Sequence, residues 1–299
     1  MGKPVFRFNV NIMKTDNIHI GTCSWKYDSW QGLVYSAPKP ENYLAEYSRK
    51  YSTVEVDQWF WSLFAGDKVV LPKDKVVSEY AGSVPESFRF GIKVPNSLTL
   101  THHYKKDTGG KMIVNPHFLS YDLMEKFLGM LEPLSGKIGP LMFQFEYLNK
   151  QKMGGVGEFA EKFGAFAARL PKDFSYCLEI RNPNYLNTTY FSLIEELGLH
   201  HVFLQGYYMP PLFDVYDKWR EYIRSLTVIR LMGGDRCEIE EKTGKKWDTV
   251  VIPRDVEIAK LAGMLADLQS REVETYLFVN NHFEGSAPRT LAKIAEILA

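Results

Sequence analysis

The chain alternates between two kinds of segment, and this alternation restricts its fold more than any other feature. Eight short apolar segments, rich in β-branched and aromatic residues, have the composition of buried strands. They are residues 18–25, 53–59, 88–94, 140–145, 176–180, 201–204, 227–231 and 275–279. A candidate helical segment follows each of them, and strict strand–helix alternation predicts a parallel sheet. Eight such units in 299 residues are what a single (β/α)8 TIM barrel requires.

The main alternative is an open, doubly wound α/β sheet. That fold usually has a glycine-rich phosphate loop after its first strand, whereas Gly21 is the only glycine between Ile20 and Ser24. No repeat or low-complexity linker divides the chain, so we assign residues 18–299 to one TIM-barrel domain. Residues 1–17 form an N-terminal extension, in which the apolar–polar alternation of residues 5–12 predicts an extra strand.

The charge balance, the cysteine content and the apolar runs indicate the compartment and the kinds of partner to expect. Lysine plus arginine equals aspartate plus glutamate, so net charge does not support nucleic acid or a membrane as a partner. The three cysteines are far apart, which suits a reducing compartment and argues against disulfides. No apolar run reaches membrane-spanning length, and residues 1–17 lack the apolar core of a secretory signal. We expect a soluble, cytoplasmic protein.

Three predicted strand-to-helix connections are long, at residues 96–115, 205–215 and 233–254. In a TIM barrel these connections lie on one face, which carries the active site. Six tryptophans follow predicted strands and are expected on that face: Trp25, Trp30, Trp59, Trp61, Trp219 and Trp247. They either form the core under the loops or offer aromatic walls to a ring-bearing ligand such as a sugar or a base. The clearest helix signal begins at Asn115 and Pro116 and runs to Leu131.

Polar residues recur near the carboxyl ends of the predicted strands. They are Cys23, Glu55, Asp57, Lys93, Gln144, Glu179, Arg181, Gln205, Arg230, Asn280 and His282. Residues two apart share a face of a strand, and charges inside apolar strands are costly to bury without partners. The pattern predicts a common polar mouth at one end of the barrel. The alternative is a purely structural ion network of Glu179, Arg181 and Arg230.

The carboxylates of Glu55 and Asp57 could raise one another's pKa for acid–base chemistry, hold a cation, or balance nearby basic groups. A metal site from these two residues with Glu179 and His282 is weakly indicated, and we predict none. Cys23 has no identifiable base beside it and is not favoured as a nucleophile. The sequence identifies no cofactor.

An anion site is predicted between the last two strands. Gly233 and Gly234 follow one strand, and Gly285 and Ser286 precede the last helix, where unpaired amides favour negative charge. Arg230 and Arg236 could complete this site. The alternative is that the glycines only serve tight turns.

Several motifs together resemble the domain of unknown function 72 family, also called the YecE-like family. They are residues 20–25, 53–57, 88–95, 139–145, 178–183, 230–231 and 279–281, with Trp30, Phe60 and Ala287. The resemblance implies a TIM barrel and no established reaction. It supports as pocket residues Glu55, Lys93, Gln144, Glu179, Arg181 and Asn280. This chain departs from the family where Met232 replaces a frequent histidine and Asp57 a frequent asparagine.

The expected function is that of an enzyme acting on an anionic or phosphorylated small molecule. Glu55, Glu179 and Lys93 are the predicted acid–base or electrophilic groups. The predicted substrate-binding residues are Trp25, Trp30, Asp57, Gln144, Arg181, Arg230, Asn280 and His282. The alternatives are a metal-dependent phosphoesterase or nucleic-acid-binding protein, and a non-enzymatic ligand-binding module.

Overall fold

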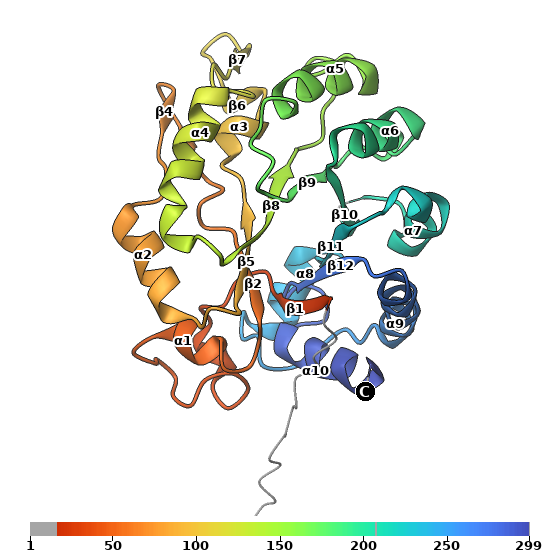
Figure 1. Ribbon diagram of the computed structural model, residues 1–299. Coiled ribbons are helices and arrows are strands. Elements are labelled where there is room, and N and C mark those ends of the chain that lie inside the picture. The colour runs from red at the N-terminus through yellow and green to blue at the C-terminus, as the bar shows by residue number, and fades with distance from the viewer. Residues whose placement is uncertain (1–16, 207, 299) are drawn as a thin grey trace, which may run out of the picture.

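The computed structural model describes residues 17–206 and 208–298, and its core is an eight-stranded parallel sheet (Figure 1). The strand order is β1-β12-β11-β10-β9-β8-β5-β2. The bounds are β1 (Ile18–Thr22), β2 (Thr53–Val56), β5 (Arg89–Lys93), β8 (Ile138–Gln144), β9 (Tyr176–Glu179), β10 (His200–Gln205), β11 (Leu226–Leu231) and β12 (Glu274–Val279). This is the predicted TIM barrel. The extra strand predicted at residues 5–12 lies outside the described residues.

The two ends of the sheet, β1 and β2, meet at a seam held by Tyr47. The Tyr47 hydroxyl accepts a hydrogen bond from the Thr22 amide at 3.0 Å and donates one to the Thr53 carbonyl, also at 3.0 Å. Gly21 permits this approach, because a Cβ atom there would lie 2.1 Å from the Thr53 carbonyl oxygen.

Eight helices cover the outside of the barrel. They are α1 (Tyr43–Tyr47), α2 (Asp74–Ser83), α4 (Tyr121–Met130), α5 (Val156–Ala167), α6 (Thr188–Leu197), α7 (Leu212–Trp219), α9 (Asp255–Ser270) and α10 (Ala287–Leu298). The shorter 3-10 turns are η1 (Asp28–Trp30), η2 (Glu132–Leu134), η3 (Pro183–Tyr185) and η4 (Arg220–Tyr222). No helix in the described part of the chain is long and apolar enough to cross a membrane.

The predicted start of α4 is wrong. The helix begins at Tyr121, and Ser120 is its N-cap, accepting a hydrogen bond from the Leu123 amide. Asn115 instead fixes the loop, because its side-chain amide donates to the carbonyls of Ser97 and Leu100. Asn115 therefore holds the loop in place and does not cap the helix, although its position in the sequence suggests a cap.

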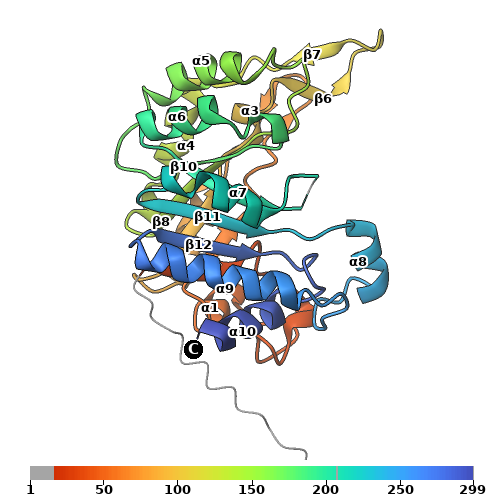
Figure 2. The ribbon, with the colours of Figure 1, turned by 90° about the vertical axis from the view of Figure 1, so that its right-hand side faces the viewer.

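Further elements decorate the end of the barrel toward which its strands point. They are the hairpin β3 (Leu63–Phe64) with β4 (Lys68–Val69), the short helix α3 (Asn96–Thr99), the hairpin β6 (His102–Lys106) with β7 (Met112–Val114), and α8 (Arg236–Thr243). Figure 2 shows α8 and the β6–β7 hairpin projecting on this side. We call this end the mouth.

The inside of the barrel is apolar below the mouth. Its buried cluster contains Cys23, Met142, Cys177, Val202, Leu204, Leu226, Val228, Met232, Tyr276 and Phe278. Gly91 makes room for Phe278, since a Cβ atom there would lie 2.4 Å from the Phe278 ring. This packed apolar layer lies beneath the polar residues of the mouth and excludes water there.

Candidate functional site

Arg230 is the centre of the polar mouth and is 2% exposed. Its Nε and Nη2 atoms donate to the two carboxylate oxygens of Glu55, both at 2.7 Å. Its Nη1 atom donates to Glu179, and it lies 3.3 Å from Gln144 Oε1. Arg181 Nε donates to the other Glu179 oxygen at 3.0 Å. These five residues form what we call the arginine cluster.

Strand alternation and register bring the arginine cluster together. Gln144 at the end of β8 pairs in register with Glu179 at the end of β9. Arg230 on β11 and Glu55 on β2 reach them from other strands of the closed sheet. The sequence predicted that all five point into the mouth, and the structure places them there.

The arginine cluster holds Glu179 in its charged form. Burial alone would raise the pKa of Glu179, but Arg230, Arg181 and Lys93 outweigh it and lower the pKa to about 2. Burial opposes the charge of Arg230 as well, yet Glu179 and Glu55 raise its pKa well above the ordinary value. The interlocked groups are therefore suited to organise the mouth rather than to exchange protons near neutral pH.

Asp57 and Lys93 occupy neighbouring positions beside the cluster. Val56 pairs with Ile92 in the β2–β5 register, so the next residues, Asp57 and Lys93, follow on adjacent strands. Lys93 is 8% exposed, and its ammonium lies 4.0 Å from the centre of the Phe60 ring. Among the described residues, neither side chain forms an ion pair. An acid and an amine thus stand side by side, and neither forms an ion pair with a described residue.

The surroundings shift the protonation of both groups toward neutrality. Burial, with a contribution from Glu55, raises the pKa of Asp57 to about 6, although Lys93 and Arg230 oppose the shift. Burial and then Arg230 lower the pKa of Lys93. Tyr27 lies close to Asp57, and burial together with the Asp57 charge raises the pKa of Tyr27 to about 12. Sequence reasoning missed Tyr27 and Phe60, which have no polar alternation to reveal them.

His282 turns away from the arginine cluster. Its Nδ1 atom lies 2.6 Å from Asn280 Oδ1, and its Nε2 atom lies 3.2 Å from Glu240 on α8. Its ring packs on Trp247. No group of three or more His, Cys, Asp or Glu side chains among the described residues is arranged to hold a metal ion. The weakly indicated metal set that included His282 is therefore not assembled.

The geometry also argues against the predicted anion site at Gly285, Ser286 and Arg236. The Gly285 amide donates to the Asn281 carbonyl and the Ala287 amide to Asn281 Oδ1, so both are already used. Arg236 pairs with Glu240 on α8. A Cβ atom at Gly285 would lie 2.6 Å from the Thr249 carbonyl oxygen, so this glycine serves close backbone packing. The turn alternative fits these contacts.

Five of the six tryptophans are buried, and one is exposed. Trp25 and Trp59 pack against Tyr80 of α2 with ring centroids 5.1 and 5.5 Å apart, and Trp30 is fully buried. Trp25 and Trp30, predicted as substrate-binding, therefore belong to the core under the loops. Trp219 is not at the mouth, because it ends α7 and stacks on Phe191 of α6. Trp61 alone of the six is exposed.

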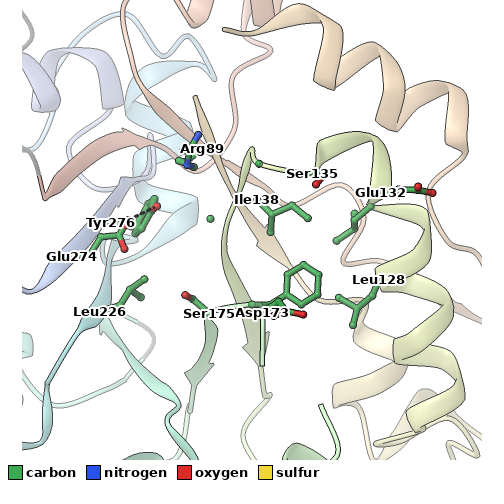
Figure 3. Close-up of a pocket in the computed structure, with 14 residues that line it drawn as sticks. Arg89, Leu128, Glu132, Ser135, Ile138, Asp173, Ser175, Leu226, Glu274 and Tyr276 are labelled. Carbon is green, nitrogen blue, oxygen red and sulfur yellow. Dashed lines mark hydrogen bonds between the residues drawn. The ribbon is translucent and has the colours of Figure 1, made fainter. Parts of the chain in front are cut away.

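A hollow of about 600 Å³ lies at the end of the barrel opposite the mouth (Figure 3). Arg89, Glu274 and Tyr276 line one side, and Leu128 and Ile138 the other. The Tyr276 hydroxyl donates to Glu274, so polar groups here satisfy one another. None of the predicted site residues lines it, and TIM-barrel chemistry occurs at the carboxyl ends of the strands. We therefore place the candidate site at the mouth.

The closed parallel barrel, with charged side chains gathered at the carboxyl ends of its strands, defines a TIM-barrel protein with a polar mouth. The model of the family described as "Protein of unknown function DUF72" matches residues 19–299. The chain belongs to this family, which confirms the resemblance seen in its motifs.

Solved structures of family members share the fold. A DUF72 protein from Enterococcus faecalis matches with a TM-score of 0.66 and 19% identity, over 94% of this chain and 95% of that one. A DUF72 protein from Thermotoga maritima matches with a TM-score of 0.64 and 19% identity, over 94% of this chain and 98% of that one. No curated protein matches the sequence significantly. At this identity the likeness concerns the fold alone.

Proposed function

We propose that this protein is an enzyme that transfers a proton to or from an anionic small molecule bound at the mouth. Asp57 is the acid–base group, and Lys93 holds the negative charge of the substrate. The observation that carries the proposal is the placement of these two side chains at the ends of adjacent strands, facing the mouth, with no ion pair to any described residue.

Asp57 suits proton transfer better than the glutamates expected to perform it. A general acid or base works best when its pKa lies near the working pH. The pKa of Asp57 is raised to about 6, whereas that of Glu179 is lowered to about 2. Both carboxylate oxygens of Glu55 accept hydrogen bonds from Arg230. The resemblance implies asparagine at position 57 in many family members, so this role is proposed for this chain.

Lys93 is the basic group best placed to receive an anion. In the arginine cluster the two glutamates balance the two arginines, which leaves no net charge for a ligand. Lys93 forms no ion pair with a described residue, and it lies in a poorly hydrated setting where a charge pair is stronger than in water. An anion beside Lys93 would also oppose the lowering of its pKa that burial causes, and so favour the charged form.

The test is a thermal-shift screen with small anions, including phosphorylated sugars and carboxylates, followed by calorimetry on the hits. Lys93→Met should abolish the response, and Asp57→Asn should keep binding but remove turnover of any converted compound. Lys105→Met, at an exposed lysine of the β6–β7 hairpin, is the matched control and should behave as wild type. Anion binding that survives Lys93→Met, or turnover that survives Asp57→Asn, contradicts the proposal.

A further inference from the structure

A row of aromatic rings leads from Lys93 out of the mouth. The Phe60 ring lies under the Lys93 ammonium at 4.0 Å and contacts the Trp61 ring edge-on, with centroids 5.1 Å apart. Trp61 in turn lies 6.1 Å from the ring of Tyr104, at an interplanar angle of 47°. Exposure rises along this row, from 3% at Phe60 to 61% at Trp61 and 59% at Tyr104.

The outer two rings come from different loops on the same side of the barrel. Trp61 follows β2, and Tyr104 lies on the β6–β7 hairpin, which projects from the mouth in Figure 2. Burial and then Glu146 raise the pKa of Tyr104, while Asn96 and Arg181 oppose the rise, so charged groups at the mouth act on this residue. The fold thus brings two large exposed aromatic side chains together on the side of the mouth where Phe60 contacts Lys93.

Packing alone does not account for these two rings. The other tryptophans of the chain are buried, with exposed fractions of 9% or less. A single exposed aromatic residue is ordinary, but adjacent ones next to a polar pocket are typical of ligand-binding surfaces. Because every heterocyclic base has a π-face, exposed aromatic side chains bind bases by stacking.

We infer that the anionic ligand of the mouth is a nucleotide-type molecule, whose planar base stacks on Trp61 and Tyr104 while its phosphate reaches Lys93. The inference rests on the proposed function and names its substrate class. Only the Phe60 ring separates Lys93 from Trp61, through contacts of 4.0 and 5.1 Å, which places the base site next to the phosphate site. Phe60 then lies beneath the sugar–phosphate part, and Asp57 stands beside the phosphate-proximal atoms of the ligand.

The experiment compares ligands with and without a base. Adenosine 5′-monophosphate, uridine 5′-monophosphate and ribose 5-phosphate are titrated into the full chain by calorimetry, with quenching of tryptophan fluorescence as a second readout. Both nucleotides should bind at least about tenfold more tightly than ribose 5-phosphate, which is the gain expected from stacking one base. Trp61→Ala and Tyr104→Ala should each remove most of that gain and leave ribose 5-phosphate binding unchanged.

Phe64→Ala is the matched control, because Phe64 is an exposed aromatic residue on the neighbouring β3 strand, 48% exposed, with no ring contact to a described residue. It should bind nucleotides as wild type does. Lys93→Met should abolish the binding of both nucleotides and of ribose 5-phosphate.

Any of four results would overturn the inference. The first is equal affinity for nucleotides and ribose 5-phosphate, which would leave the proposed function standing. The second is nucleotide binding that is unchanged in Trp61→Ala and Tyr104→Ala. The third is much tighter binding of a single-stranded hexanucleotide than of a mononucleotide, which would point to a polymeric ligand. If none of the three compounds binds, the nucleotide assignment fails, and the wider anion screen decides the proposed function separately.

Discussion

Replacing Arg230 with methionine should destabilise the protein strongly. The change leaves the buried carboxylates of Glu55 and Glu179 without their main partner, and stranding a buried charge costs about 3–5 kcal/mol. The pKa of Glu179 gives an independent figure. Its fall from 4.5 to about 2 corresponds to roughly 3 kcal/mol of stability at neutral pH.

The loss should depend on pH in a definite direction. The folded-state pKa of Glu179 is depressed, so its contribution to stability is present above its unfolded pKa and is lost as pH falls from about 5 toward 2. Wild type should therefore lose stability in acid more steeply than Arg230→Met, whose stranded carboxylates can take up protons. The difference between the two proteins should shrink as the pH is lowered.

The assay is urea unfolding at 25 °C, followed by circular dichroism between pH 2.5 and pH 8. Arg224→Met is the matched control, because Arg224 forms an ion pair with Glu195 at 2.8 Å but is 67% exposed, and such pairs contribute less than about 1 kcal/mol. The triple change Glu55→Gln, Glu179→Gln and Arg230→Met should recover part of the loss, since it strands no charge. A loss in Arg230→Met no larger than that in Arg224→Met would refute this reasoning.

Three further predictions concern single positions. Lys93→Met should leave the free energy of unfolding in urea unchanged or raise it by about 1 kcal/mol, because it removes a buried charge without an ion-pair partner. A large decrease in this free energy would mean that Lys93 has a structural role. Asp57→Asn should raise the melting temperature at pH 7 but not at pH 4. The folded-state pKa of Asp57 is raised to about 6, so ionisation of Asp57 makes the folded protein less stable as pH rises through that value. Equal effects of the substitution at both pH values would contradict the pKa shift. Gly285→Ala should lower the free energy of unfolding in urea by at least about 2 kcal/mol, because φ is +111° and the new Cβ would meet the Thr249 carbonyl. The control Gly157→Ala, with open space around it, should be neutral or stabilising. Similar results for the two variants would show that the backbone at Gly285 accepts a Cβ atom without strain.

The sequence predicts the barrel well because its signals are local. Periodicity and capping residues fix α6 to residues 188–197, where Asn187 caps the first turn and Gly198 ends the helix in the left-handed conformation. Alternation along each strand likewise predicts which side chains enter the mouth. Elements inside the long connections, such as α8 and the β6–β7 hairpin, have no comparable apolar pattern and were not predicted.

The roles of the site residues depend on distances between strands, which a single sequence does not supply. Glu55 and Asp57 look alike in the sequence, yet one is bound by Arg230 and the other is not. Gly285 carries the same glycine signal whether it binds an anion or admits a neighbouring backbone. Only the closed barrel shows that Asn281 already occupies the amides at this turn.

The measurement that tests the account most directly is the titration of the carboxyl groups by carbon-13 NMR, in wild type and in Asp57→Asn. We predict one carboxyl signal with a midpoint near pH 6 that disappears in Asp57→Asn, and a Glu179 signal that does not titrate above pH 4. If instead the Asp57 signal has its midpoint near pH 4, or the signal near pH 6 belongs to Glu179, the division between a locked arginine cluster and a proton-transferring Asp57 is contradicted.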